Sequence, residues 1–273
     1  MGENTAAFEI TGLDDERISC FFRLTESELA NQRNAEHGLF IAEGEKVIGH
    51  AIEAGIEPVS FLTDKRHLEK ALKLAEKCPG SIVYTGESAL LGEITGFRMN
   101  RGFLAAMKRP PEKKVSALIA SGGRLCVLED LRDPANVGAV MRSAPALGMD
   151  GVLISPSCTD PLHRRAVKSS MGCVFSVSWA RCTDIRETTE ELKTNGYLCV
   201  ALALDKNSVS ITDPRLKEAE RLALYVGTEG DGLKRETVAL CDFSAIIPMH
   251  NGADSLNAAA AAAVAFWETG KKL

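Results

Sequence analysis

The sequence predicts an α/β protein of two domains, a small one followed by a larger one built on a parallel sheet. Short apolar runs alternate with amphipathic stretches along the chain, which is the pattern of strands and helices in turn. In the second half the apolar runs are nearly continuous, as in strands covered on both faces. A charged segment with two adjacent prolines, residues 108–114, interrupts the alternation. We expect the domain boundary there, because proline continues neither a helix nor a central strand.

The first domain is expected over residues 1–110 and contains four predicted strands and three predicted helices. The first of these helices has apolar residues at helical spacing and ends at Gly55, a residue at which helices commonly stop. The strands are 38–44, 58–64, 81–86 and 101–109, and the helices are 45–55, 66–78 and 87–95.

The second domain is expected over residues 115–273 and begins with a short helix at 115–121. Six apolar runs follow, with helical stretches between most of them, and this alternation predicts the parallel sheet. The runs are 124–131, 151–156, 174–180, 197–204, 221–227 and 243–249.

The composition is that of a globular protein, with 45% hydrophobic and 25% charged residues. The net charge of −5 does not exclude nucleic acid, since a local basic face suffices for that partner. None of the eight cysteines forms a CxxC pair, so we expect no zinc ribbon and no metal. With no signal peptide at the N-terminus we expect a reducing, cytoplasmic environment, and the longest apolar run is too short to span a bilayer.

Three loops that follow strands carry residues suited to a ligand site, which in an open parallel sheet lies beyond the carboxyl ends of the strands. The first loop and its helix occupy residues 133–148. Here Asn136 is a candidate helix cap, Gly138 allows close approach, and Arg142 offers a planar fork for a phosphate or carboxylate. Read alone, the stretch is also explained by a capped helix with a surface arginine. Pro145 is expected to kink or end this helix.

The second loop, within residues 225–233, lies at the end of the apolar run at 221–227 and contains Gly227, Gly230 and Gly232. Their spacing, GxxGxG, is neither the dinucleotide fingerprint nor a Walker loop. Glu229 lies between the glycines and could hydrogen-bond a neighbouring loop or a ligand hydroxyl. An ordinary glycine-rich turn is the alternative explanation.

The third loop begins within the last apolar run and leads into an alanine-rich helix, all within residues 246–268. Ser255 is a candidate N-cap for that helix. The alanines favour a helix and give it a thin surface, so that other segments or a second subunit can pack close. A plain buried helix explains the alanines equally well but not the preceding Ser-Leu-Asn sequence.

In this order, across residues 124–268, the three loops resemble the SpoU (TrmH-like) family of RNA 2′-O-ribose methyltransferases. The residues that carry the resemblance are Asn136, Gly138 and Arg142 in the first loop, Gly227, Glu229, Gly230 and Gly232 in the second, and Ile247, Pro248, Met249, Ser255, Leu256 and Asn257 in the third. The region before the linker resembles the family's N-terminal substrate-binding domain, an α/β module similar to certain ribosomal proteins, mainly through residues 40–52.

The resemblance implies a catalytic domain whose C-terminal part forms a deep trefoil knot, an exception to the usual absence of knots. It implies S-adenosylmethionine as the cofactor, bound in the knot, and RNA as the partner. It also implies a homodimer, with the alanine-rich helix and the helix of the first loop near the interface.

The site residues are likewise implied by the resemblance. The cofactor-binding residues would be Leu202, Ala203, Gly227, Glu229, Gly230, Ile247, Met249, Ser255 and Leu256. The catalytic residues would be Arg142, Asn136, Glu229, Ser255 and Asn257.

Methyl transfer to a ribose hydroxyl requires that two atoms be aligned and that the hydroxyl lose its proton. Since arginine is almost always protonated, we expect Arg142 to orient the adjacent RNA phosphate and stabilise the developing alkoxide. Direct proton abstraction by Arg142 is the alternative.

RNA binding also needs positive charge, and two basic groups are candidates, although each could equally be a solvated face. The group in the first domain contains Arg98, Arg101, Lys108 and Arg109, and the group in the second contains His163, Arg164, Arg165 and Lys168. Within them we expect the RNA contacts at Arg98, Arg101, Arg164, Arg165 and Lys168.

The sequence thus predicts a ribose methyltransferase acting on structured RNA, with ribosomal RNA favoured because an accessory domain suits a large substrate. Transfer RNA is the alternative substrate. A non-catalytic RNA-binding module of the same fold is a second alternative, which predicts loss of Arg142 or of the glycines, and all are present. An unrelated dehydrogenase would carry GxGxxG after the first strand of the sheet, and this motif is absent there.

Overall fold

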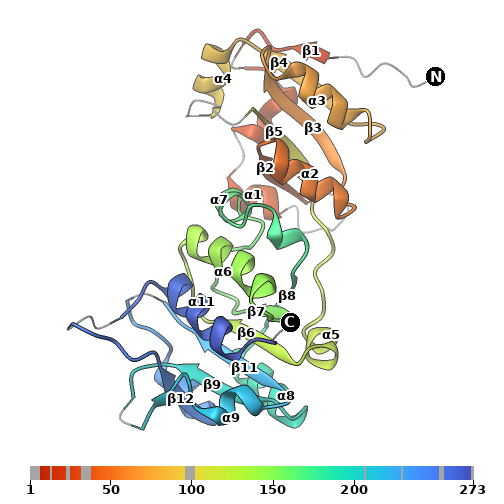
Figure 1. Cartoon of the computed structure of the whole chain (residues 1–273). Helices are drawn as coiled ribbons and strands as arrows, with labels where there is room; N and C mark the ends of the chain where they lie inside the picture. Colours follow the sequence, from red (N-terminus) through yellow and green to blue (C-terminus); the bar gives the residue numbers. More distant parts are fainter. Residues whose placement is uncertain are drawn as a thin grey trace. The chain divides into compact units, whose positions relative to one another are not determined.

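The computed structural model divides into two compact units and is drawn in Figure 1. Unit 1 comprises residues 1–111 together with 162–175, and unit 2 comprises 112–161 together with 176–273. The second piece of unit 1 falls inside the larger predicted domain, which the sequence analysis treated as continuous. The structure describes residues 7–12, 14–22, 25–31, 38–95, 102–205, 207–228, 230–251 and 255–271.

Unit 1 is built around a mixed sheet. Its described strands are β1 (Ala7–Glu9), β2 (Leu39–Glu43), β3 (Pro58–Asp64), β4 (Ile82–Gly86) and β5 (Phe103–Lys108). They lie in the order β1-β4-β3-β5-β2, with β5 antiparallel to both neighbours and the pairs β1–β4 and β4–β3 parallel. The helices are η1 (Glu16–Phe21), α1 (Glu26–Asn31), α2 (Glu45–Glu53), α3 (Leu68–Ala75), α4 (Ser88–Thr95), α7 (Arg164–Ser169) and η2 (Cys173–Phe175).

Every strand and helix predicted between residues 38 and 109 is present, and β1, η1 and α1 are additions. These three elements are only three to six residues long. A hydrophobic period cannot be seen over so short a stretch, which is why the sequence did not reveal them.

Two apolar layers hold unit 1 together, because successive strand residues point to opposite faces of the sheet. Leu62 and Leu104 lie in a buried cluster with residues of η1, α1 and α4. Phe61 and Phe103 point the other way, with ring centroids 6.3 Å apart. Helices α2 and α3 lie side by side in Figure 1 and cover that second face.

The segment 162–175 belongs to unit 1 through contacts with β2 and α2. The buried carboxylate of Glu43 accepts hydrogen bonds from Lys168 Nζ at 2.7 Å and from Arg164 Nη2 at 3.3 Å. The ring of Phe175 lies 5.6 Å from that of Phe40. Ion pairs and an aromatic contact thus attach α7 and η2 to the sheet of unit 1.

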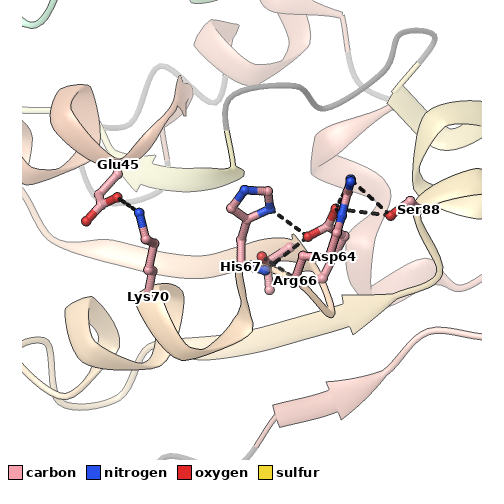
Figure 2. Close-up of polar contacts among 7 residues, drawn as sticks. Glu45, Asp64, Arg66, His67, Lys70 and Ser88 are labelled. Atoms are coloured by element: carbon pink, nitrogen blue, oxygen red, sulfur yellow. Dashed lines mark hydrogen bonds and ion pairs between the residues drawn. The ribbon is translucent and has the colours of Figure 1, made fainter.

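A second buried carboxylate, Asp64, organises the loop after β3 (Figure 2). It accepts hydrogen bonds from Arg66 Nη2 at 2.6 Å, from the His67 ring at 2.7 Å and from the hydroxyl of Ser88 at 3.0 Å. Burial alone would raise the pKa of Asp64, but these hydrogen bonds outweigh it and hold the pKa below its ordinary value. The cluster ties the end of β3 to the first residue of α4.

Unit 2 is built on a seven-stranded sheet in which every pair of neighbours is parallel. Its strands are β6 (Arg124–Leu128), β7 (Gly151–Ile154), β8 (Ser178–Arg181), β9 (Leu198–Leu202), β10 (Val209–Ser210), β11 (Leu222–Val226) and β12 (Phe243–Ile246). The order is β10-β12-β9-β11-β6-β7-β8. The predicted α/β fold with a parallel sheet is confirmed, with the two-residue β10 as an unpredicted edge strand.

Helices cover both faces of this sheet. They are α5 (Val115–Ser121), α6 (Pro134–Ala146), α8 (Ile185–Thr194), α9 (Pro214–Glu218), α10 (Arg235–Leu240) and α11 (Ala258–Thr269). On one face, Leu118 of α5 and Leu192 of α8 join a buried cluster with Val127 and Tyr225 of the central strands. Helices α6 and α11 pack against each other, as Figure 1 shows, and α6 also contacts β7.

All eight cysteines are free thiols. Burial raises the pKa of the Cys182 and Cys199 thiols to about 11, so both stay protonated at neutral pH. Within the described residues, no helix combines the length and apolar character needed to cross a membrane. No group of three or more His, Cys, Asp and Glu side chains in the same residues is arranged to hold a metal ion.

Candidate active site

The carboxyl ends of β9, β11 and β12 lie at one edge of the sheet, because these three strands are adjacent and parallel. This is the edge at which open α/β sheets bind their ligands. The segments that follow the strands are 203–205, 227–234 and 247–257. Two of them are the second and third loops that the sequence analysis singled out.

The second loop, called here the glycine loop (residues 227–233), folds back on its own base. Thr228 and Gly232 each donate a backbone N–H to the other's carbonyl at 3.1 Å. A Cβ placed on Gly227 would lie 2.2 Å from the carbonyl carbon of Gly232, so only glycine fits there. Gly232 adopts a φ of +69°, a left-handed conformation that also favours glycine. Glu229 lies outside the described residues.

The first loop leads into α6 and meets the third loop through an amide pair. Asn257 Nδ2 donates to Asn136 Oδ1 at 3.0 Å, although the two residues are 121 positions apart in the chain. Asn136 is buried in the first turn of α6, and Arg142 is exposed further along the same helix. Pro145 lies in the last turn, and the helix ends one residue after it, at Ala146.

Two predicted helix caps were wrong. Asp133, not Asn136, caps α6: its carboxylate accepts from the N–H of Ala135 at 3.0 Å. The helix begins at Pro134, because proline is pre-set for the first helical position, and the residue before it becomes the cap. Asn257, not Ser255, caps α11, since Asn257 Oδ1 accepts from the first free N–H groups of that helix.

A cavity of about 940 Å³ opens between the ends of these strands. Eight of the nine residues predicted to bind a cofactor line it, and the ninth, Glu229, lies outside the described residues. The eight are Leu202, Ala203, Gly227, Gly230, Ile247, Met249, Ser255 and Leu256. They come from three segments spread over residues 202–256, and the parallel sheet brings them to one cavity.

The cavity also contains charged side chains that were not predicted as site residues. Asp205, Asp231 and Arg235 line it together with aliphatic groups from β9, β11 and β12. Asp205 directly follows an apolar run, and Arg235 lies two residues after the glycine loop. Their position after predicted strands was the one feature of the sequence that could have identified them as site residues.

Other predicted residues lie elsewhere. Asn136, Arg142 and Asn257 are not part of the cavity wall, and Ser255 is the one predicted catalytic residue among those described that lines it. Among the predicted RNA contacts, Arg98 and Arg101 lie outside the described residues. Arg164 and Lys168 pair with Glu43, as described above, and Arg165 is exposed on α7.

Known proteins share the sequence pattern and the fold of this chain. The family described as the SpoU rRNA Methylase family matches residues 124–267. A protein of Mycobacterium tuberculosis named as an uncharacterized tRNA/rRNA methyltransferase is 35% identical over 257 residues, which cover 93% of this chain and 88% of that protein.

Among solved structures, the AdoMet-bound rRNA methyltransferase of Sinorhizobium meliloti aligns with a TM-score of 0.78 at 25% identity, over 96% of this chain and 97% of that one. The SpoU methyltransferase AviRb of Streptomyces viridochromogenes, in complex with AdoMet, aligns with a TM-score of 0.72 at 24% identity, over 88% and 94%. The family match spans more than half of the chain and the mycobacterial relative nearly all of it. The chain therefore belongs to the SpoU rRNA Methylase family.

Proposed function

We propose that this protein is an S-adenosylmethionine-dependent methyltransferase that methylates a ribose 2′-hydroxyl in structured RNA, with ribosomal RNA as the substrate. One observation carries the proposal. Eight residues chosen for cofactor binding from the sequence, in three distant segments, line a single cavity at the ligand-binding edge of the sheet. Membership in the SpoU rRNA Methylase family supports the same activity.

The cavity is large enough for S-adenosylmethionine and offers it both apolar and charged groups. Aliphatic side chains such as Leu202, Ile247 and Leu256 offer an apolar wall for the adenine, and the glycine loop exposes backbone groups for polar atoms. The carboxylates of Asp205 and Asp231 favour a cationic ligand. When bound, the cofactor supplies an electrophilic methyl group on a sulfonium sulfur.

Arg142 is the proposed catalytic group. It is exposed on α6, whose first turn is held to the third loop by the Asn136–Asn257 hydrogen bond. A guanidinium keeps its proton, so its contribution is to grip the RNA phosphate beside the target ribose and to stabilise the alkoxide as the hydroxyl proton leaves. Ser255, on the cavity wall, is a candidate hydrogen-bond partner for the cofactor or the ribose.

The RNA is bound partly by unit 1, the proposed substrate-binding domain. In α7, Arg165 is exposed, whereas Arg164 and Lys168 share the carboxylate of Glu43, which offsets part of their charge. All three side chains remain proposed phosphate contacts. Arg98 and Arg101 remain proposed contacts.

The protein is proposed to act as a homodimer, with its third loop in the trefoil knot of the family. Helix α11 packs against α6 on one side but leaves Val264 40% and Trp267 74% exposed. Side chains of this kind are costly to leave in water, and a second copy would cover them. The interface would then lie beside the helix that carries Arg142.

Methyl transfer from labelled S-adenosylmethionine to total RNA tests the function. We expect label in ribosomal RNA, at nucleotides that resist alkaline hydrolysis because their 2′-oxygen is blocked. Arg142→Ala is expected to lower the rate about 100-fold or more, as the loss of one charge-stabilising donor does elsewhere, while cofactor binding measured by calorimetry is retained. Arg186→Ala, at an exposed arginine on α8, is the matched control and should leave the rate unchanged.

The outcomes separate the alternatives. Label confined to transfer RNA would identify that substrate instead. Tight RNA binding with no methyl transfer to any cellular RNA would favour the non-catalytic module.

A further inference from the structure

Glu129 is a buried carboxylate that no step of the proposed reaction uses. It directly follows β6 and is only 2% exposed. Its Oε2 accepts the backbone N–H of Lys234 at 3.0 Å, and its Oε1 accepts the hydroxyl of Thr237 at 2.6 Å. Its own N–H donates to the carbonyl of Val226 at 2.9 Å, which prolongs the β6–β11 pairing. A carboxyl group this deeply buried is costly unless it is hydrogen-bonded, and both oxygens of Glu129 accept hydrogen bonds.

The next residue, Asp130, holds the same lysine by its side chain. Lys234 Nζ lies 2.8 Å from an Asp130 carboxylate oxygen, and the other oxygen accepts the hydroxyl of Ser155 at 3.0 Å. The backbone of Asp130 is left-handed, with a φ of +55°, a strained conformation for a residue other than glycine. Burial raises the pKa of Asp130, but hydrogen bonds led by that from Lys234 outweigh it, and the pKa lies below its ordinary value.

Lys234 lies between the glycine loop, which ends at Leu233, and α10, which begins at Arg235. Lys234 is the N-cap of α10, and its side chain provides no cap, so the carboxylate of Glu129 supplies an acceptor from outside the helix. The other end of the loop is fixed at Gly227 by the close packing against Gly232. Between these two points the described residues of the loop form part of the cavity wall.

We propose that Glu129 is a positioning residue for cofactor binding, which acts by fixing the C-terminal base of the glycine loop. Glu129 does not line the cavity, so its effect reaches the ligand only through the loop. The identity of the ligand rests on the proposed function, whereas the fixing of the loop does not. Asp130 assists through its ion pair with Lys234.

Two readouts test the proposal on the full chain. Hydrogen exchange of the Thr228 and Gly232 amides, which are bonded across the loop, reports loop order without any ligand. The dissociation constant for S-adenosylmethionine, measured by calorimetry, reports the consequence for binding.

Glu129→Ala removes both acceptors, and we expect at least tenfold faster exchange of these amides and at least tenfold weaker cofactor binding, since the loss of one hydrogen bond to a carboxylate already corresponds to about tenfold. Thr237→Val removes one donor and is expected to give a smaller change in the same direction. Glu129→Gln retains an acceptor for the Lys234 N–H and should restore most of the protection. Thr188→Val, which removes a buried threonine hydroxyl bonded within α8, is the matched control and should change neither readout.

Unchanged exchange in both Glu129→Ala and Thr237→Val would overturn the proposal and leave Glu129 as a general contributor to the fold. Faster exchange with unaltered cofactor affinity would overturn its link to binding. If the wild-type protein does not bind S-adenosylmethionine, the proposed function fails, and the exchange data still decide whether Glu129 fixes the loop.

Discussion

At the scale of single residues, polar side chains in this protein act mainly by joining segments that are distant in sequence. Asn257 caps α11 through its oxygen and reaches Asn136 through its nitrogen, so one amide connects the first and third loops. The sequence identified both asparagines as site candidates but assigned the cap of α6 to Asn136 and that of α11 to Ser255, whereas Asp133 and Asn257 are the caps. A cap depends on the residue at which the helix starts, and helix boundaries are the least certain part of a sequence pattern.

Asp64 provides a residue-scale prediction in unit 1 (Figure 2). Asp64→Asn should destabilise the protein by about 1–3 kcal/mol at pH 7, because the buried acceptor of Arg66, His67 and Ser88 loses its charge. The folded-state pKa of Asp64 lies below its ordinary value of 3.8, so its stabilising contribution is present above that pH and is lost as the pH falls through the folded-state pKa. The stability difference between wild type and Asp64→Asn should therefore shrink below about pH 3.8.

Urea unfolding at a series of pH values measures this difference. Glu45→Gln is the matched control, because the Glu45–Lys70 pair in the same figure is 2.8 Å long but exposed, and it should contribute less than about 1 kcal/mol. A stability difference for Asp64→Asn that is independent of pH from neutral to pH 2 would contradict the assignment.

At the scale of elements, the conformation of the glycine loop requires glycine because of a close backbone contact rather than because of flexibility. Gly227 faces the backbone of Gly232 at a distance that no Cβ tolerates, whereas a Cβ on Gly230 would meet no atom within 4 Å. Both glycines line the same cavity. The sequence showed that the loop is rich in glycine, and the structure shows which of these glycines has no room for a side chain.

Gly227→Ala should therefore destabilise the protein by about 1–3 kcal/mol through overpacking and should weaken cofactor binding. Gly230→Ala, the matched control within the loop, should change stability by less than about 0.5 kcal/mol. Thermal unfolding without ligand, followed by calorimetric titration with S-adenosylmethionine, measures both effects. Equal stability of the two variants would show that the loop relaxes around the added methyl group.

At the scale of the whole molecule, the apolar side of α11 leads to a prediction about assembly. Trp267→Glu places a charge on the surface proposed to be shared by two copies, so the variant should sediment as a monomer where the wild type sediments as a dimer. Phe8→Glu, at a 48% exposed aromatic residue of β1 in unit 1, is the matched control and should leave the oligomeric state unchanged. Analytical ultracentrifugation distinguishes these outcomes. A wild-type protein that is monomeric at micromolar concentration would rule out the proposed dimer.

The division into units shows which part of the domain organisation the sequence pattern predicts. The proline-containing segment lies where unit 1 first ends, at Pro111, because local chemistry alone breaks the alternation there. No comparable break in the sequence pattern accompanies residues 162–175, which belong to unit 1. Their place in that unit depends on Glu43 meeting Arg164 and Lys168, which lie more than 120 positions further along the chain.

The sequence by itself determined the secondary structure of most of the chain, the parallel sheet and the positions of the loops, because hydrophobic period and turn residues are local properties. It also named eight of the residues that line the cavity, six of them in the second and third loops of a family pattern. Only the tertiary structure decided which side chains pair: Asn136 with Asn257, Glu129 with Lys234 and Thr237, and Glu43 with α7. Those pairings depend on which strands become neighbours, since a buried polar group is stabilised only by a partner that the fold places within reach.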